Sequence, residues 1–374
     1  MTDVQSRNVL YLPSTPLNIL VSVAHAEAYA SEQKSRLILI DQKSEQDNPY
    51  FNVLKKWRNS PFENVNLILG TAQGKQKLKE RKANFVKLVG LIKDFKVDAI
   101  AVGSDRRVEF QYLMHQCTKK NTEVEGWYLD DGLYSYSGRR PSWWKDGLNK
   151  QLKKVFYGDW WQEPKTVGAS DWIRQVWLFR PRQAVTELKS KIMNPLKPQW
   201  FISPGVREFS QKVCEAYNFR SEMLTRLQSI DLFLLIPHPN NIKKMQGYEP
   251  RIQQFLTQMQ KKGVQVATKY HPRTETADPL QLQEKYQALL IPSGLAFEFV
   301  LPFLKNEALV VGDVGTALLT AQWLRSDLRV SAVLASEDEF QNTFKALYLQ
   351  LGVNIAEDFN EISMPSVLTS GKGK

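Results

Sequence analysis

Two adjacent carboxylates, Asp130 and Asp131, stand directly before Gly132 in the first half of the sequence. They follow a short apolar run, residues 126–129, that has the composition of a buried strand. A carboxylate at that place can accept a proton from an attacking hydroxyl, and a neighbouring carboxylate raises its pKa. Gly132 permits a tight turn that exposes the side chain. The pair therefore predicts a general base, with a simple cap of the following turn as the alternative.

Two histidines of the second half each precede a proline. His271 comes before Pro272 and is flanked by Lys269 and Arg273. Proline biases the preceding residue toward an extended conformation, which projects the imidazole from the end of a strand. The flanking cations favour an anion, and a phosphate fits such a site. His238 offers the same arrangement after another apolar run, and one of the two histidines could serve only as a turn residue.

Further polar candidates follow later strands. Gly315 and Thr316 lie in a run of small residues that opens a predicted helix after the strand 308–311. Free backbone N–H groups and a hydroxyl at a helix start favour an anion. Glu298 lies among apolar residues of a second predicted helix, 293–300. Its carboxylate could bond ribose hydroxyls, or it could be a solvated helix carboxylate.

Three residues of the first half are candidates for binding rather than catalysis. Thr15 follows the first predicted strand, either as a helix cap alone or in a loop whose backbone donors face a ligand. Arg106 and Arg107 follow the fourth strand and could neutralise an anion. The alternative for the arginines is that they are solvated charges in the first turn of a helix.

Apolar, β-branched runs alternate with helical patterns in both halves of the chain. Near-continuous apolar strands separated by helices predict parallel sheets covered on both faces. The simplest fold is α/β, with two doubly wound domains joined by a linker, and ligands bind beyond the carboxyl ends of such strands. The strands are expected at residues 9–12, 37–40, 65–69, 98–102, 126–129, 176–179, 232–236, 264–268, 288–291, 308–311 and 330–334.

Composition narrows the class of protein. The chain has 374 residues, enough for about two domains, and a net charge of +11, which favours polyanionic ligands. Its two cysteines, Cys117 and Cys214, cannot build a disulfide framework and are expected to be buried thiols of a reducing compartment. With four histidines and no zinc or EF-hand spacing, no metal site is expected.

No targeting segment and no membrane-spanning run is recognisable, so the sequence predicts a cytoplasmic protein. The segment 139–165 holds seven Lys or Arg against three acids, and four of the ten tryptophans. It predicts either an interfacial helix on the inner face of an anionic cytoplasmic membrane, a groove for an acidic glycan, or a packed helix with solvated lysines. The basic residues of the helical part are Lys145, Lys150, Lys153 and Lys154.

Taken together, these residues resemble the bacterial sialyltransferases of the GT-B fold, in particular the lipooligosaccharide sialyltransferase and capsular polysialyltransferase group. The group is marked by an acidic pair before Gly, a His-Pro pair and a small hydroxyl-bearing motif near the C-terminus. Most of the chain is covered, in the expected order and spacing. The matching pieces are Asp130-Asp131-Gly132, His271-Pro272, Gly315-Thr316 and the opening Thr15-Pro16-Leu17.

The resemblance implies two Rossmann-like domains that face a central cleft. An acceptor-side domain would comprise residues 1–190 and a nucleotide-binding domain residues 191–374, with a last helix that could pack back on the first domain. It also implies an inverting, metal-independent transfer of sialic acid or a related nonulosonic acid from a CMP donor to a cell-surface glycan, lipooligosaccharide or capsule. No cofactor and no nucleic-acid partner is expected.

Residue roles follow from the same resemblance. Asp131 would be the general base, with Asp130 as the fallback, and His271 would donate to the departing CMP phosphate. Glu298 would hold the ribose. The phosphate site would be completed by Gly315 and Thr316, where the group usually has paired serines, so one hydroxyl is lost. The remaining expected contacts are Pro272 and Lys269 on the nucleotide and Thr15, Arg106 and Arg107 on the acceptor side of the cleft.

Two other functions stay open at this stage. One is a GT-B transferase that uses another activated sugar, such as a Kdo donor or a nucleoside-diphosphate sugar. The other is a non-enzymatic polyanion-binding protein, which the net charge of +11 and the basic segment would suit. Against the latter, the charge is diffuse outside one segment and no named nucleic-acid motif is present.

Overall fold

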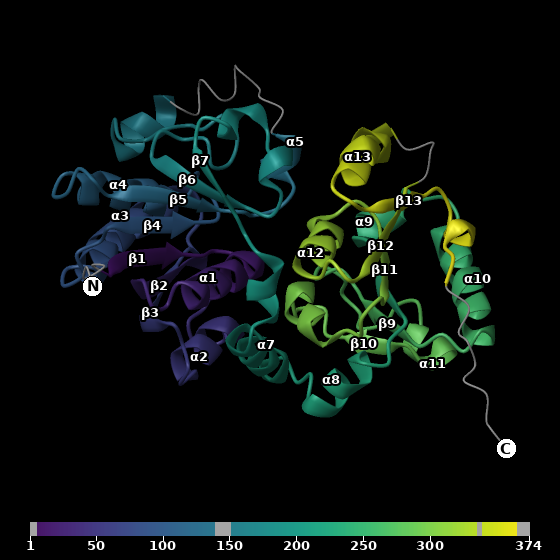
Figure 1. Cartoon of the computed structure of the whole chain (residues 1–374). Helices are drawn as coiled ribbons and strands as arrows, with labels where there is room; N and C mark the ends of the chain where they lie inside the picture. Colours follow the sequence, from purple (N-terminus) through teal and green to yellow (C-terminus); the bar gives the residue numbers. More distant parts are fainter. Residues whose placement is uncertain (1–5, 139–150, 335–338, 365–374) are drawn as a thin grey trace. The chain divides into compact units, whose positions relative to one another are not determined.

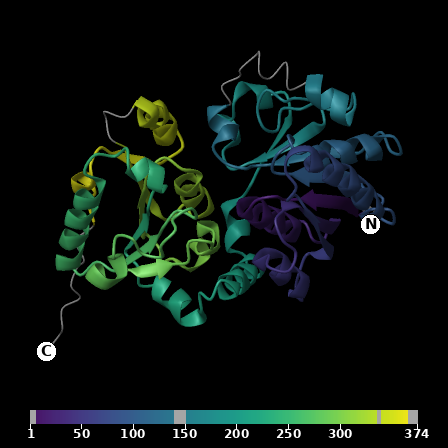
Figure 2. The same ribbon diagram turned by 180° about the vertical axis from the view of Figure 1, so that it is seen from behind.

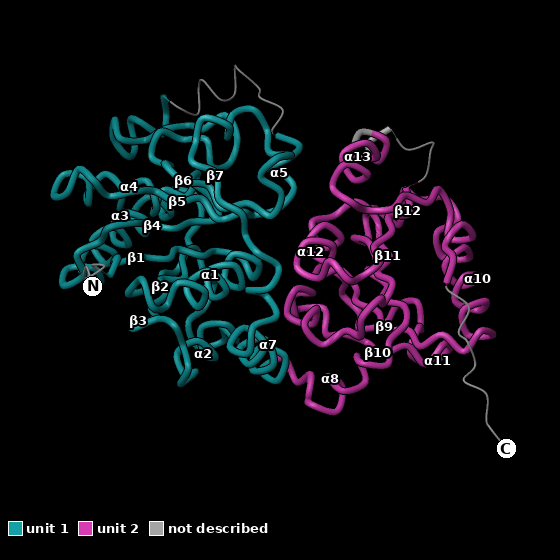
Figure 3. The backbone as a smooth tube through the Cα atoms, viewed as in Figure 1, with its two compact units in different colours: residues 1–216 teal, residues 217–374 magenta. Residues whose placement is uncertain are grey.

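The structure is a computed structural model that describes residues 6–138, 151–334 and 339–364. The chain forms two compact units, residues 1–216 and 217–374 (Figure 3). Each unit is built on one parallel sheet with helices on both sides of it (Figure 1, and from behind in Figure 2). The predicted α/β class with two doubly wound domains is confirmed.

Unit 1 contains a seven-stranded sheet in the order β3-β2-β1-β4-β5-β6-β7. Every neighbouring pair is parallel. The order reverses between β1 and β4, which is the switch point where doubly wound sheets bind ligands. The strands are β1 Arg7–Leu12, β2 Gln33–Gln42, β3 Phe62–Leu69, β4 Ala99–Val102, β5 Glu125–Leu129, β6 Ile173–Leu178 and β7 Ile192–Pro195.

Unit 2 repeats this arrangement with six parallel strands in the order β10-β9-β8-β11-β12-β13. Its switch point lies between β8 and β11. The short strand β13 near the C-terminus was not predicted from the sequence. The strands are β8 Leu232–Leu235, β9 Val266–Lys269, β10 Leu289–Ile291, β11 Leu309–Gly312, β12 Arg329–Val333 and β13 Asn354–Ala356.

The helices of unit 1 form two covering layers. On one face of the sheet α7 contacts both α1 and α2, and on the other face α3 contacts α4. A further helical segment covers residues 151–157. The helices are α1 Pro16–Ala28, α2 Pro49–Lys56, α3 Gly74–Leu91, α4 Val108–Thr118, α5 Tyr134–Ser137 and α7 Pro204–Ala216.

In unit 2, α12 packs on β11 and β12, and α13 packs on β13 of the same unit. Glu298 lies in the short 3₁₀ helix Phe297–Phe299 rather than in the longer helix that was predicted. The helices are α8 Ser221–Leu227, α9 Pro239–Ile242, α10 Tyr248–Lys261, α11 Leu282–Tyr286, α12 Thr316–Leu324 and α13 Glu339–Gln350.

The central strands form the core of each unit. All four residues of β4 are buried, as the near-continuous apolar run predicts for a strand covered on both faces. Both cysteines are free and buried, as predicted. Burial raises the pKa of Cys117 to about 11 and of Cys214 to about 12, which keeps both thiols protonated at neutral pH.

The boundary between the units lies later than the predicted position between residues 190 and 191. The connection between the predicted strands 176–179 and 232–236, expected to contain the linker, contributes β7, which pairs in parallel with β6. It continues into α7, which packs on α1 and α2. Because these contacts all belong to unit 1, the division falls between Ala216 and Tyr217.

The tryptophan-rich segment falls partly outside the described residues, which exclude Trp143, Trp144, Lys145 and Lys150. In the described part, Trp161, which follows the helical segment 151–157, is 1% exposed and packs with Phe85 and Val108 in a small core. Lys153 pairs with Glu163 at 2.9 Å. The segment 151–157 also leaves Leu152, Val155 and Phe156 exposed to solvent.

Candidate active site

Asp131 lies just beyond the carboxyl end of β5, where Gly132 adopts a positive φ of 111°. Its Oδ1 accepts a hydrogen bond from Asn18 Nδ2 at 2.6 Å and a long one from Thr15 Oγ1 at 3.5 Å. The tyrosine hydroxyl of Tyr128 accepts from the Asp131 backbone N–H at 3.2 Å. The carboxylate is thus held in one orientation by residues of α1 and β5.

Burial raises the pKa of Asp131 to about 6, against the hydrogen bond from Asn18, and the negative charge of Asp130 adds to the rise. The guanidinium of Arg107 opposes it. A general base works best when its pKa lies close to the operating pH, since it is then both ionised and basic enough to take a proton. The side chain therefore has the properties that the sequence predicted for a base.

Asn18 was not predicted from the sequence. It is buried in the first turn of α1, whose N-cap is Thr15. To reach Asp131, its amide crosses the end of β4 above Gly103. A Cβ on Gly103 would lie 2.1 Å from Asn18 Nδ2, so only glycine leaves room for this amide. In the sequence Asn18 was only a weak signal, because its contact with Asp131 depends on where α1 lies over the sheet.

Asp130 has a different role from Asp131. It is fully buried, and its two oxygens accept from four donors: Gly132 N–H, the Ser135 hydroxyl, the Tyr136 hydroxyl and Phe179 N–H. Burial raises its pKa, while these four hydrogen bonds oppose the rise. A carboxylate with both oxygens occupied inside the protein cannot reach a substrate hydroxyl. Asp130 instead ties the β5 turn to the end of β6.

The two predicted arginines are engaged by acids of unit 1. Arg106 bonds the nearly buried Glu163, which also binds Lys153. Arg107 bonds Asp41 at the end of β2. Both guanidinium groups are therefore already paired with carboxylates. The charge of Arg107 still lowers the pKa of Asp131. Thr15 caps α1, as the first alternative predicted, and its hydroxyl also contacts Asp131. A loop whose backbone donors face a ligand stays a prediction.

In unit 2, His271 follows the end of β9 and is partly exposed. Its Nδ1 accepts from the backbone N–H of Arg273 at 3.1 Å. Burial lowers its pKa, and the charges of His238, Lys269 and Arg273 lower it further. The neutral imidazole is therefore favoured in the free protein, and binding of an anion would favour the protonated form. Pro272 is exposed and holds the turn.

Lys269 lies beneath this turn and is 6% exposed. Its Nζ donates to the carbonyl of Ser293 at 2.7 Å and to that of Tyr270 at 3.2 Å. Burial lowers its pKa to about 8, although the carboxylate of Glu298 favours the charged form. The structure therefore assigns Lys269 to holding the loops after β9 and β10, with its charge close to the candidate anion site.

Glu298 is not a solvated helix carboxylate, since it is 9% exposed. Its Oε1 accepts from the Thr320 hydroxyl of α12 at 3.2 Å, and burial raises its pKa while Lys269 opposes the rise. Glu298 thereby joins the loop after β10 to α12. Thr320, one turn beyond Thr316, was not predicted from the sequence.

The small-residue loop before α12 is held by a residue of α13. The Tyr348 hydroxyl accepts from Gly315 N–H at 2.6 Å and donates to the Gly315 carbonyl at 3.0 Å. The Gly315 amide is therefore occupied, whereas Thr316 lies at the first position of α12. Gly315 is extended, with φ of −174°, and a Cβ there would meet no atom within 4 Å.

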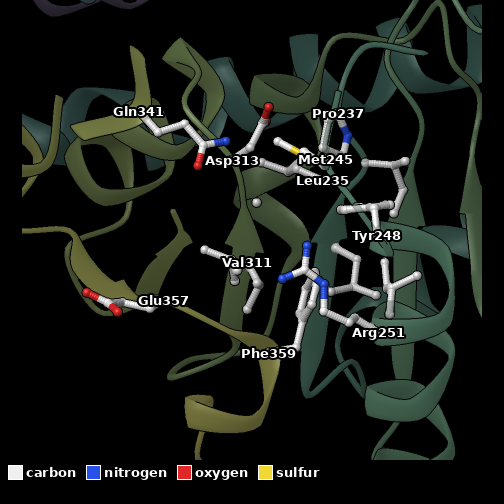
Figure 4. Close-up of a pocket in the computed structure, with 15 residues that line it drawn as sticks. Leu235, Pro237, Met245, Tyr248, Arg251, Val311, Asp313, Gln341, Glu357 and Phe359 are labelled. Atoms are coloured by element: carbon white, nitrogen blue, oxygen red, sulfur yellow. The ribbon is translucent and has the colours of Figure 1, made fainter. Parts of the chain in front are cut away.

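A narrow pocket in unit 2 lies at the carboxyl ends of β8 and β11 (Figure 4). Its cavity volume is about 30 Å³, which suits one or two waters and not a nucleoside. Asp313 lies at its edge, and burial raises the pKa of this carboxyl to about 6 against a hydrogen bond from Asn241. Its walls include Tyr248, Ile252, Val311 and Phe359.

The predicted residues thus fall into two groups, one in each unit. In unit 1 the structure brings together Asp131 and Thr15, and in unit 2 it brings together Lys269, His271 and Glu298. Within the described residues, no group of three or more His, Cys, Asp or Glu side chains is arranged to hold a metal ion. Nor does any helix in those ranges have the length and apolar character needed to cross a bilayer.

Comparison of the structure with solved ones defines the fold. The chain is similar to an α/β-galactoside α-2,3-sialyltransferase from Photobacterium phosphoreum, with a TM-score of 0.59 and 13% identity over 96% of this chain and 100% of that one. The GT-B domain of a sialyltransferase from Photobacterium damselae matches with a TM-score of 0.51, 11% identity and coverage of 94% and 100%. These likenesses show the predicted GT-B fold.

A UDP-GlcNAc 2-epimerase from Neisseria meningitidis is also similar, with a TM-score of 0.51 and 12% identity over 94% of this chain and 88% of that one. The fold alone therefore does not select one reaction. Among curated proteins, no sequence relative is found.

The sequence itself carries the more specific signal. The family model described as alpha-2,8-polysialyltransferase (POLYST) matches residues 242–334. That span includes Lys269, His271, Glu298, Gly315 and Thr316. Residues 242–334 are thus similar to the alpha-2,8-polysialyltransferase family that the sequence resemblance pointed to, and the chain has the GT-B fold found in sialyltransferases.

Proposed function

We propose that the protein transfers sialic acid or a related nonulosonic acid from a CMP donor to a cell-surface glycan, lipooligosaccharide or capsule, with inversion and without a metal. The observation that carries this proposal is the polysialyltransferase family match, because it spans the candidate nucleotide-binding residues of unit 2. CMP is already a good leaving group, so the reaction does not need a metal to neutralise a diphosphate.

In this proposal Asp131 takes the proton of the acceptor hydroxyl as the oxygen attacks the anomeric carbon of the donor. The new glycosidic bond forms while the bond from that carbon to the phosphate oxygen breaks, and its electron pair leaves on CMP. His271 donates to the phosphate as negative charge develops there. Attack on the face opposite the leaving group inverts the configuration.

Each group has a supporting observation. The pKa of Asp131 near 6 suits a base at neutral pH. Donors aimed at developing charge contribute as much as the base or more. The cluster of His271, Lys269 and Arg273 supplies such a positive environment. Glu298, held by Thr320, is the proposed partner of the ribose hydroxyls.

The direct test is incubation of the protein with CMP-sialic acid and a panel of glycans, with products identified by mass. We expect an Asp131→Asn variant to lose about 10²–10⁴-fold in transfer rate and to keep its affinity for CMP. Asp94→Asn removes another carboxylate of the same unit, which pairs with Arg36 and does not act on Asp131, and serves as the control. Wild-type turnover in Asp131→Asn would refute the assignment of the base.

A second candidate function is transfer from another activated sugar, which the likeness to UDP-GlcNAc 2-epimerases favours at the level of fold. Thermal shifts with CMP, UDP, GDP and short oligonucleotides separate a CMP donor from a nucleoside-diphosphate donor and from polyanion binding. The proposed function predicts stabilisation by CMP alone. Stabilisation by UDP or GDP would indicate a nucleoside-diphosphate sugar, and stabilisation by oligonucleotides alone would indicate a polyanion-binding protein.

We further propose that the protein rests on an anionic membrane surface beside a glycolipid acceptor. Three exposed apolar side chains, Leu152, Val155 and Phe156, lie on the helical segment 151–157 within a basic stretch of sequence. Apolar side chains next to lysines are the features that bind such surfaces. Co-sedimentation with anionic liposomes should fall in the double variant Val155→Ser, Phe156→Ser. Unchanged co-sedimentation would refute the membrane proposal.

A further inference from the structure

The two His-Pro turns of unit 2 are built alike and lie side by side. His238 follows β8 and His271 follows β9, and these two strands are paired neighbours. In each turn the imidazole Nδ1 accepts a backbone N–H two residues further on, from Asn240 at 3.0 Å and from Arg273 at 3.1 Å. The two rings are 4.6 Å apart between centroids and meet edge to face.

This geometry determines which nitrogens are available. Because each Nδ1 is an acceptor, the proton of each neutral ring resides on Nε2. Among the residues that the structure describes, neither Nε2 has a hydrogen-bond partner. Both histidines are partly exposed. Two imidazole N–H donors with the same local geometry are therefore available at the carboxyl ends of the neighbouring strands β8 and β9.

The groups around this pair are mostly cationic. Lys269 lies beneath the His271 turn and Arg273 lies within it, and both charges act on His271. On the other side, Asp313 after β11 is bonded to Asn241, which is three residues beyond His238. An anion with several oxygens would accept from both rings, and its charge would favour a proton on one of them.

We propose that His238 is a second phosphate-binding imidazole, which binds the phosphate of the leaving nucleotide together with His271. This inference rests on the proposed function and names a residue outside the matched family region, residues 242–334. Burial and the charges of His238, Lys269 and Arg273 lower the pKa of His271 in the free protein, which opposes its protonation. Phosphate binding offsets this effect, so the complex takes up a proton that the free protein lacks.

The experiment compares CMP with cytidine as ligands, because only CMP carries the phosphate. His238→Asn is the informative variant, since an asparagine oxygen can still accept the Asn240 N–H but the Nε2 donor is gone. His271→Asn makes the matched change in the neighbouring turn. We expect His238→Asn to weaken CMP binding about 10-fold or more and to leave cytidine binding unchanged.

Calorimetry in two buffers of different ionisation enthalpy gives the second readout. Wild-type protein should take up protons on binding CMP near pH 7, and His238→Asn should take up fewer. Equal CMP affinity and equal proton uptake in wild type and His238→Asn would overturn the inference. Loss of cytidine binding as well would also overturn it, since that would show a purely structural role.

Failure of the proposed function gives a different result. If wild-type protein binds neither CMP nor cytidine, the proposed donor is wrong, and the inference about His238 is wrong with it. If wild-type protein binds CMP and His238→Asn binds it equally, only the inference fails.

Discussion

The two units have the same strand order around the switch point but present opposite chemistry at their strand ends. In unit 1 the reactive group is a carboxylate, Asp131, oriented by Asn18 and Thr15. In unit 2 the candidate groups are imidazoles, His238 and His271, whose Nε2 atoms are unbonded in the described part of the chain. The candidate site of unit 1 is acidic, and its carboxylate is already hydrogen-bonded. The candidate site of unit 2 is basic, and its imidazole Nε2 donors have no partner among the described residues.

The difference follows from the work that each group is proposed to do. A general base must be held in one place, must be deprotonated, and needs a pKa close to neutral pH. Burial and fixed hydrogen-bond donors are therefore useful. A phosphate-binding group must give its hydrogen bonds to the ligand, so unmet donors at a partly exposed edge are useful. The carboxyl ends of two sheets with the same strand order thus support different roles through different loops.

The largest effect on stability is expected where unit 1 is most tightly bonded, at Asp130. Its two oxygens each accept from two donors in the interior, so Asp130→Asn turns an NH2 group toward two of these donors. We expect a loss of about 2–4 kcal/mol in local stability. Hydrogen exchange of amides 125–137 measures it.

The control is Asp41→Asn, because Asp41 forms a partly exposed ion pair whose loss should cost less than about 1 kcal/mol. If exchange in 125–137 were equally fast in wild type and Asp130→Asn, Asp130 would not be the anchor of this turn, and the contrast with Asp131 would weaken.

The next effect concerns how Asp131 is tuned. Asn18→Ala removes a hydrogen bond that lowers the pKa of Asp131, so this pKa should rise above about 6. A base is active above its pKa. The acid limb of the kcat/KM profile should therefore move to higher pH, by up to about one unit.

Gly103→Ala should shift the profile in the same direction, because its Cβ would displace the Asn18 amide. Gly90→Ala, where a Cβ meets nothing within 4 Å, is the matched control and should leave the profile unchanged. If the kcat/KM profile shifted in neither Asn18→Ala nor Gly103→Ala, Asp131 would not be the titrating base.

The sequence was sufficient for the features that depend on strand ends. Apolar runs located most of the strands, and parallel pairing places the residues that follow them at one edge of each sheet, which is why the positions of Asp131 after β5 and of His271 after β9 were predictable. The position of α1 over β4 was not, so Asn18 and Gly103 were missed. Their contact depends on helix packing across three strands, and no local pattern encodes it.

The same limit explains the other differences. The segment before residue 200 lacks a long apolar run, so its short edge strand, β7, was interpreted as linker. The ion pairs of Arg106 and Arg107 involve Glu163 and Asp41, which are distant in sequence. Tyr348 reaches Gly315 from a helix that lies later in the chain. Each of these depends on tertiary contacts.

The smallest expected effect tests the open site of unit 2. Gly315→Ser would restore a second hydroxyl beside Thr316, and the structure has room for it, since a Cβ at Gly315 meets no atom within 4 Å. If the phosphate binds at the start of α12, this hydroxyl adds one donor, and CMP affinity should rise about 2- to 10-fold. Cytidine affinity should not change.

Gly312→Ser is the contrasting variant, because its Cβ would lie 3.0 Å from Leu235 Cβ, so it should destabilise unit 2 instead. Equal CMP affinity in wild type and Gly315→Ser would place the phosphate away from α12 and leave the His238–His271 edge as its binding site.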